Sequence, residues 1–137
     1  MLKWKDSYSV NVEEIDNQHK KLFEIGISLY NLSSLKDDFD HYDEIVNIID
    51  ELRDYTIYHF NFEEDLLRKN GYEDIESHSI EHDFFVKKLK RIEKKDIDGQ
   101  QNQAIMEMTE FLIDWISSHI LQSDMQYKAY LNSKGVY

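Results

Sequence analysis

The absence of proline is the feature that most restricts how this chain of 137 residues can fold, and only four glycines accompany it. Proline removes a backbone hydrogen-bond donor and disrupts the preceding turn of a helix, while glycine weakens a helix through its conformational freedom. The rest of the sequence is rich in Leu, Ile, Glu, Asp and Lys. This combination predicts long uninterrupted helices rather than a sheet or a loop-rich fold.

Four segments carry apolar or histidine side chains at steps of three and four residues, the pattern of a helix with one buried face. They span about 15–29, 40–69, 75–92 and 105–119. The second ends at Asn70-Gly71, a common signal for the end of a helix. Acidic residues at 37–40 and turn-prone residues at 96–99 separate the others. A further short segment, 124–131, either continues the fourth helix or forms a separate piece.

Short connections between helices predict that neighbours in sequence are antiparallel neighbours in space. We therefore expect an all-α chain, folded as an up-down-up-down antiparallel four-helix bundle with a short C-terminal helical segment. Its length predicts one domain over residues 1–137. A different packing of the same helices is the alternative.

The chain is acidic, with 28 Asp and Glu against 16 Lys and Arg, and its net charge of −12 is distributed along the sequence. Such a surface repels nucleic acid and anionic lipid, so neither is an expected partner. The N-terminus lacks the apolar core of a signal peptide, and no apolar run reaches the roughly 20 residues of a membrane span. These features favour a cytoplasmic protein. Because cysteine is absent, any metal must be held by nitrogen and oxygen atoms.

Histidine occupies the predicted buried stripes at five positions where Leu or Ile is usual: His19, His59, His78, His82 and His119. In an antiparallel bundle all five fall at one end, where the first and third helices begin and the second and fourth end. Any one of them alone is more simply a core histidine with ordinary hydrogen bonds. Five without partners, at about 1 to 3 kcal/mol each, rival the whole stability of a domain, about 5 to 15 kcal/mol. The five together predict a metal site.

Two carboxylates extend this set. Glu63 lies four residues after His59 and points the same way. Asp124 lies five residues after His119, which an ideal helix places about 140° away, so a π-bulge or a helix end near residue 122 is needed to bring both inward. Five imidazoles and two carboxylates exceed the ligands of one ion and suit two ions bridged by the carboxylates. If each carboxylate bridges with both oxygens and an oxo or hydroxo group bridges the two octahedral ions as well, one coordination position is left for a small diatomic ligand.

Across nearly its whole length the sequence resembles the hemerythrin family, and in particular its single-domain bacterial members. The matching stretches are residues 12–20 (VEEIDNQHK), His59-Phe60 with Glu63-Glu64, His78 with His82, Trp115 with His119-Ile120 and Asp124, and the ending Tyr127, Tyr130-Leu131 and 134–136. Ligands at these spacings over four helices make a specific signal, unlike a single His-x-x-x-His.

The resemblance implies a cofactor of two non-haem iron ions joined by an oxo or hydroxo bridge. It also implies a role for each residue: His78, His82 and His119 hold one iron, His19 and His59 hold the other, and Glu63 and Asp124 bridge them. The implied function is reversible binding of dioxygen at the two-histidine iron, for storage, delivery or sensing. Enzymatic turnover is not expected.

Reversible binding favours a ligand pocket with apolar walls, which give bound oxygen no proton donor and no substrate. The candidates for this wall are Phe23, Phe62, Trp115, Ile116 and Ile120. Aromatic residues at helical spacing are about as often plain core. Gln122 and Ser123 add polar groups near the site, and either would favour faster oxidation of the iron if it faced the open position.

Two other classes of function stay open on the sequence alone. One is a di-iron oxidase or peroxidase, or a nitric-oxide-reactive protein, although ferritin-like enzymes use carboxylate-rich sites with Glu-x-x-His pairs. The other is a sensor module that acts through a protein partner, which the sequence does not identify. The spacing of the ligands also suits zinc and copper, so iron rests on the resemblance.

Overall fold

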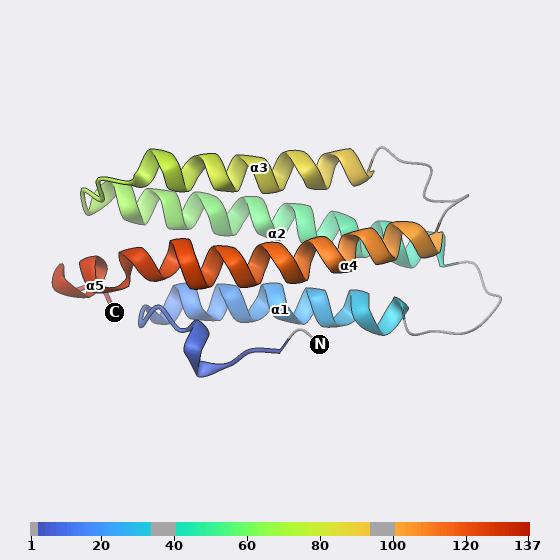
Figure 1. Ribbon diagram of the computed structural model, residues 1–137, viewed down its shortest axis with the longest axis horizontal. Coiled ribbons are helices and arrows are strands. Elements are labelled where there is room, and N and C mark those ends of the chain that lie inside the picture. Colours follow the sequence, from blue (N-terminus) through green and yellow to red (C-terminus); the bar gives the residue numbers. More distant parts are fainter. Residues whose placement is uncertain (1–2, 34–40, 94–100) are drawn as a thin grey trace.

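The computed structural model describes residues 3–33, 41–93 and 101–137 (Figure 1). Its elements are a 3₁₀ turn, η1 (Asp6–Tyr8), four long α-helices, α1 (Glu13–Ser33), α2 (Tyr42–Lys69), α3 (Ile75–Glu93) and α4 (Gln101–Ser118), a π-helical turn, η2 (His119–Asp124), and a last α-helix, α5 (Met125–Ser133). The described residues form no strand. The predicted all-α fold class is confirmed.

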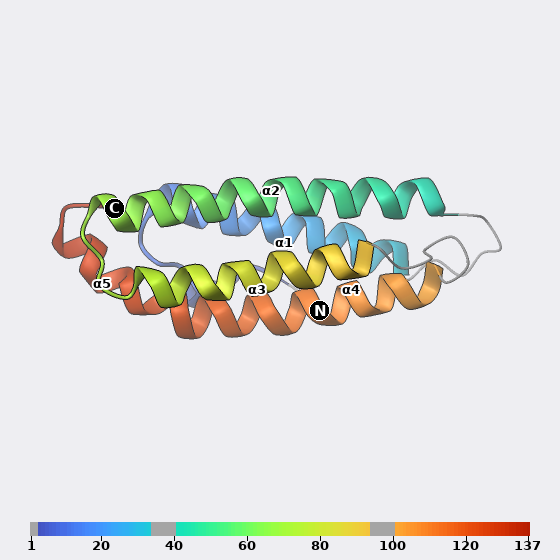
Figure 2. The ribbon, with the colours of Figure 1, turned by 90° about the horizontal axis from the view of Figure 1, so that it is seen from above.

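The four long helices run side by side and alternate in direction, so α1 and α3 begin at the end of the bundle where α2 and α4 finish (Figures 1 and 2). Both α1 and α3 pack against α2 and α4. This is the predicted up-down-up-down arrangement. The helix predicted from about residue 40 is described from Tyr42, and the connections predicted at 37–40 and 96–99 lie outside the described residues.

The turn between α2 and α3 forms where the sequence predicts it, at Asn70-Gly71. Gly71 has a φ of +73°, in the left-handed region that favours glycine. The N–H of Tyr72 donates to the carbonyl of Leu67 at 3.0 Å, and the N–H of Gly71 donates to the carbonyl of Arg68 at 3.1 Å. These two bonds make a Schellman motif, which satisfies carbonyls that the end of the helix leaves without partners. The tight turn keeps α2 and α3 in contact at this end of the bundle.

The C-terminal part of α4 departs from ideal helical geometry. After Ser118 the chain enters the π-helical turn η2, and α5 leaves this turn at the end of the bundle (Figure 1). The irregularity predicted near residue 122 is therefore confirmed as a π-helix. The segment 124–131, left open by the sequence, belongs mostly to a separate helix. The hydroxyl of Tyr130 in α5 donates to the carbonyl of Asn70 at 2.5 Å, which ties α5 to the α2–α3 turn.

Two apolar clusters fill the bundle. The larger cluster contains residues of all four long helices, with Leu29 and Leu89 fully buried in it. The smaller cluster contains Leu67 and Leu131 and is completed by the N-terminal segment and α5. Each of the four long helices, with η2 as the continuation of α4, carries buried histidines or carboxylates where the larger cluster meets the smaller one. These polar side chains form a layer between the two clusters. None of the described helices is long and apolar enough to cross a membrane.

Candidate metal centre

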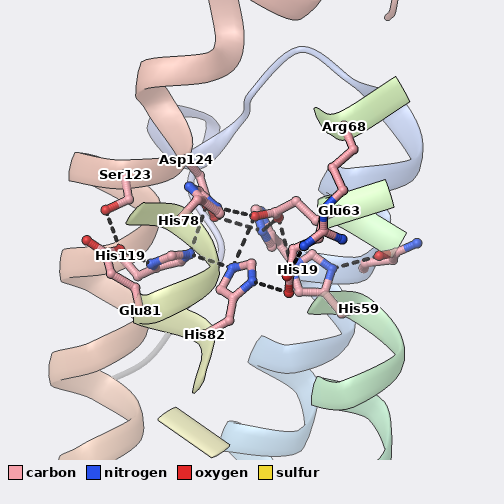
Figure 3. A network of polar contacts seen from close by, with 12 residues as sticks. His19, His59, Glu63, Arg68, His78, Glu81, His82, His119, Ser123 and Asp124 are labelled. Carbon is pink, nitrogen blue, oxygen red and sulfur yellow. Dashed lines mark hydrogen bonds and ion pairs between the residues drawn. The ribbon is translucent and has the colours of Figure 1, made fainter. Parts of the chain in front are cut away.

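Seven buried titratable side chains meet in the polar layer between the two apolar clusters (Figure 3). None is more than 5 % exposed. They are His19 from α1, His59 and Glu63 from α2, His78 and His82 from α3, and His119 and Asp124 from η2. The structure thus brings together all seven residues predicted from the sequence. Their role as metal ligands stays a prediction.

Glu63 directs its two carboxylate oxygens at two different groups of histidines. Its Oε1 contacts Nε2 of His78 and lies 3.3 Å from Nε2 of His82. Its Oε2 lies 3.2 Å from Nε2 of His59 and 3.7 Å from Nε2 of His19. A carboxylate with its oxygens divided in this way can bridge two cations.

Asp124 shows the same division from the π-helical turn. Its Oδ2 lies 3.1 Å from Nε2 of His19, whereas its Oδ1 lies 2.9 Å from Nε2 of both His78 and His119. The π-helix explains this position, because its hydrogen bonds join residues five apart, whereas an ideal α-helix places such residues about 140° from each other.

The donor atoms of the cluster form two groups, and within each group all atoms lie within 4.8 Å of one another. The first contains one atom each from Glu63, His78, His82, His119 and Asp124. The second contains atoms of His19, His59 and Glu63. Two compact groups that share a carboxylate suit two neighbouring ions better than one.

Several facing atoms in the cluster lack a hydrogen bond, although they lie close to one another. They are Nε2 of His19, Oε2 of Glu63 and both carboxylate oxygens of Asp124. A buried polar atom without a partner costs about 1 to 3 kcal/mol. Cations placed among these atoms would satisfy all four, so the residues present fit a metal centre.

His82 and His119 give a separate indication of a cation. Their Nε2 atoms face each other at 3.1 Å, while Nδ1 of His82 lies 3.1 Å from Glu64 and Nδ1 of His119 lies 2.7 Å from Glu81. When each Nδ1 proton is donated to a carboxylate, the two Nε2 atoms that face each other need a proton or a metal ion between them, because two lone pairs at this distance repel each other. Adjacent nitrogens bound at about 2.1 Å to one octahedral ion are about 3 Å apart, close to the observed separation.

Three polar residues that the sequence analysis missed orient the histidines from behind. Gln18 accepts a hydrogen bond from Nδ1 of His59 at 2.6 Å, and Glu64 and Glu81 serve the two histidines just described. Each of the three is next in sequence to a clustered residue of its own helix, but its side chain contacts a histidine of the following element. Gln18 of α1 thus contacts α2, Glu64 of α2 contacts α3, and Glu81 of α3 contacts η2. The only signal in the sequence is a polar residue next to a clustered residue, and the structure shows which flank faces the next helix.

The charge state of three histidines follows from their burial and their carboxylate contacts. Burial lowers the pKa of His19, but the nearby carboxylates of Asp124 and Glu63 outweigh burial and raise this pKa to about 9. The same opposition raises the pKa of His78 to about 10. Burial also lowers the pKa of His119, yet the negative charge of the adjacent Asp124 carboxylate raises it to about 9. Without a metal, these histidines therefore hold protons at neutral pH.

The remaining groups of the site are shifted in other ways. Burial dominates at His59 and lowers its pKa. For Glu63 and Asp124, burial favours the neutral acid, but the surrounding histidines hold the pKa of both carboxyl groups well below the ordinary range. The hydrogen bond with His119 lowers the pKa of Glu81 to about 2. The site thus contains two anionic carboxylates and requires positive charge, from protons or from metal ions.

The residues predicted to wall a ligand pocket are divided between the two apolar clusters. Four lie in or against the larger cluster: Phe23, Trp115, Ile116 and Ile120. The ring of Trp115 stacks on the ring of His119, with centroids 4.2 Å apart. Phe62 packs against the smaller cluster instead. Phe60, which the sequence analysis did not propose for the pocket, stacks flat on His82 with centroids 3.8 Å apart.

Gln122 and Ser123 point away from the cluster. Gln122 is exposed, and the hydroxyl of Ser123 donates to Glu81 at 2.5 Å (Figure 3). Neither residue therefore meets the condition on which faster oxidation was expected. His41, the sixth histidine, lies at the N-terminal boundary of α2 and contacts Glu44 rather than the cluster.

Comparisons with known proteins indicate one family. The sequence matches the Hemerythrin HHE cation binding domain over residues 10–131, a range that contains the whole cluster. It is 44 % identical to the bacteriohemerythrin of Clostridium acetobutylicum over 129 residues, which cover 93 % of this chain and 98 % of that protein. It is 32 % identical to the bacteriohemerythrin of Methylococcus capsulatus, with 88 % of each chain covered.

A solved structure shows the same arrangement of helices. The crystal structure of a wild-type hemerythrin matches with a TM-score of 0.76 and 28 % sequence identity. The match covers 94 % of this chain and 96 % of the hemerythrin chain. The predicted four-helix bundle is therefore supported by sequence and by fold.

Proposed function

Because the chain belongs to the hemerythrin family, we propose that this cation-binding protein binds dioxygen reversibly at a pair of iron ions held by its buried cluster. The family follows from the match to the cation-binding domain over residues 10–131. The observation that supports a two-ion centre most directly is the division of the carboxylate oxygens of Glu63 and Asp124 between two groups of histidines.

The proposed ligands are the seven clustered residues, with the roles that the family resemblance implies. His78, His82 and His119 would hold one ion, His19 and His59 would hold the other, and Glu63 and Asp124 would be shared by both. The contacts support this grouping, since one oxygen of each carboxylate lies closest to histidines of the first set and the other to histidines of the second. The two-histidine position has fewer protein ligands and is the one proposed to be open to oxygen.

A pair of ferrous ions supplies the two electrons that dioxygen binding requires, and the chain supplies the environment. The rings of Phe60 and Trp115 cover two of the histidines, and Ile116 and Ile120 are buried beside them. These largely apolar side chains keep water from the three-histidine side of the cluster, which favours binding and release over turnover. Tyr127 adds a buried hydroxyl near the site, and burial raises its pKa well above the ordinary value, so the hydroxyl keeps its proton.

The alternative function is a di-iron oxidase or peroxidase, or a protein that reacts with nitric oxide. Two carboxylates among seven donors make this site poorer in carboxylate than ferritin-like centres. Iron itself is part of the proposal, because imidazole and carboxylate donors also bind zinc and copper. A test must therefore report the metal and the reaction together.

We would purify the protein with iron, reduce it without air, admit oxygen, and record the visible spectrum over repeated cycles beside the iron content. Two irons per chain and an absorption band that appears with oxygen and disappears on its removal are expected. His41→Leu, which changes the histidine outside the cluster, should behave like the unchanged protein, and His59→Leu should lose the band. Steady consumption of oxygen or of nitric oxide, or a centre that oxidises once and does not recover, would contradict reversible binding.

A further inference from the structure

The three-histidine half of the cluster is held from behind by two carboxylates. Glu64 lies 3.1 Å from Nδ1 of His82, and Glu81 lies 2.7 Å from Nδ1 of His119. Glu81 also accepts a hydrogen bond from the hydroxyl of Ser123 at 2.5 Å. One carboxylate of α3 therefore fixes the imidazole that begins the π-helical turn and the residue that precedes Asp124 (Figure 3).

The two-histidine half has no carboxylate in the equivalent place. Nδ1 of His59 has the neutral amide of Gln18 as its partner. Nδ1 of His19 is buried and has no hydrogen bond. The partners behind His82 and His119 are thus anionic, whereas the partner behind His59 is uncharged.

A carboxylate that accepts the Nδ1 proton of an imidazole fixes its tautomer and orientation and makes Nε2 a stronger ligand. We propose that the two metal positions fill in order, the three-histidine position first, and that Glu64 and Glu81 are the positioning residues that set this order. This inference rests on the metal centre of the proposed function. It adds that the three-histidine position binds a metal ion more tightly than the two-histidine position. Loss of such a partner typically weakens metal binding about 10- to 100-fold, so we expect at least a tenfold difference between the two positions.

The order can be tested with Zn²⁺, a diamagnetic ion that undergoes no redox reaction. The full chain, stripped of metal and labelled with ¹⁵N in its histidines, is titrated with Zn²⁺ while the imidazole signals are followed by NMR. The first equivalent should shift the signals of His78, His82 and His119, and the second should shift those of His19 and His59. The larger number of protein ligands at the three-histidine position favours the same order, so the part played by the two glutamates is tested separately with variants.

Two glutamine variants test the cause of the order. Glu81→Gln and Glu64→Gln keep the size of the side chain but remove its charge, and each should weaken binding of the first Zn²⁺ about 10- to 100-fold and leave the second nearly unchanged. Asp83→Asn is the matched control, because it removes the same charge from an exposed position of α3 and should change neither affinity. Gln18→Leu should weaken only the second ion.

The outcomes separate this inference from the proposed function. If the unchanged protein binds no Zn²⁺ at the cluster, the metal centre itself is wrong. If it binds two ions but both sets of histidines shift together, or His19 and His59 shift first, only the order is wrong. If the order is observed but the two glutamine variants resemble Asp83→Asn, the glutamates are not its cause. The two variants are independent, so a failure of one to fold leaves the other as the test.

Discussion

Removal of the metal is expected to make the bundle less stable as pH rises above neutrality. In the metal-free protein, burial lowers the pKa of His19, His78 and His119, but their contacts with Asp124 and Glu63 raise these values to about 9, about 10 and about 9. In the unfolded chain each histidine has a pKa near 6.5. Between these values the folded state binds more protons than the unfolded state, so the free energy of unfolding falls as pH rises.

The size of the effect follows from the number of protons retained. Each proton held only by the folded state contributes a slope of about 1.4 kcal/mol per pH unit. One such histidine gives this slope, and all three together give about 4 kcal/mol per pH unit, a large part of the stability of a small domain, about 5 to 15 kcal/mol. The lowered pKa values of Glu63, Asp124 and His59 act below pH 6.5 and add nothing in this window.

The assay is urea unfolding followed by circular dichroism at pH 6.5, 7.5 and 8.5, on protein stripped by a chelator and on protein loaded with metal. Stripped protein should lose at least about 1.4 kcal/mol between pH 7.5 and 8.5. Loaded protein should hold its stability or gain some, because metal binding releases protons and is favoured at higher pH. Stripped protein that is already unfolded at pH 6.5, or is as stable at pH 8.5 as at pH 6.5, would refute the reasoning that protons replace the metal ions.

Three sets of substitutions test other parts of the structure. Glu63→Gln and Asp124→Asn each remove a proposed bridge, and metal analysis should find no more than one ion per chain; two ions in either variant would contradict the bridging role. Phe60→Ala removes a ring that is 4 % exposed and should destabilise the protein by about 3 to 5 kcal/mol, whereas Tyr58→Ala, at a ring 50 % exposed, should change stability by less than about 1 kcal/mol. Thr56→Val should leave stability unchanged or raise it by up to about 1 kcal/mol, since its buried hydroxyl has no hydrogen-bond partner; a clear loss in urea unfolding would show that the hydroxyl has one.

The helices and the seven clustered residues could be predicted because both depend on regular geometry. A repeat of three and four residues fixes which side chains share a face, and antiparallel order fixes which ends of the helices meet. His19 early in one helix and His59 late in the next must then lie at the same level. Asp124 was the harder case, since its spacing from His119 agreed with the cluster only if the helix was irregular, and η2 supplies that irregularity.

The partners behind the histidines were not predicted, because their role depends on how neighbouring helices are rotated against each other. Glu81 has a side chain 47 % exposed, and the sequence around it looks like an ordinary solvated face. Glu64 is only 12 % exposed, but in the sequence it follows Glu63 and looks like another residue of a solvated, charged face. Phe62 packs away from the larger cluster for the same reason, since periodicity alone did not say which apolar layer it joins.

The π-helical turn links the fold to the candidate site. An α-helix continued past His119 would turn Asp124 away from the cluster, whereas the π geometry allows its carboxylate to reach His19 on the opposite side of the site. The same turn gives α5 a new direction at the end of the bundle, where Tyr127 and Leu131 are fully buried in the smaller cluster. A single irregularity therefore positions one carboxylate and covers the site with apolar side chains, and Glu81, which contacts residues near both ends of the turn, stabilises both effects.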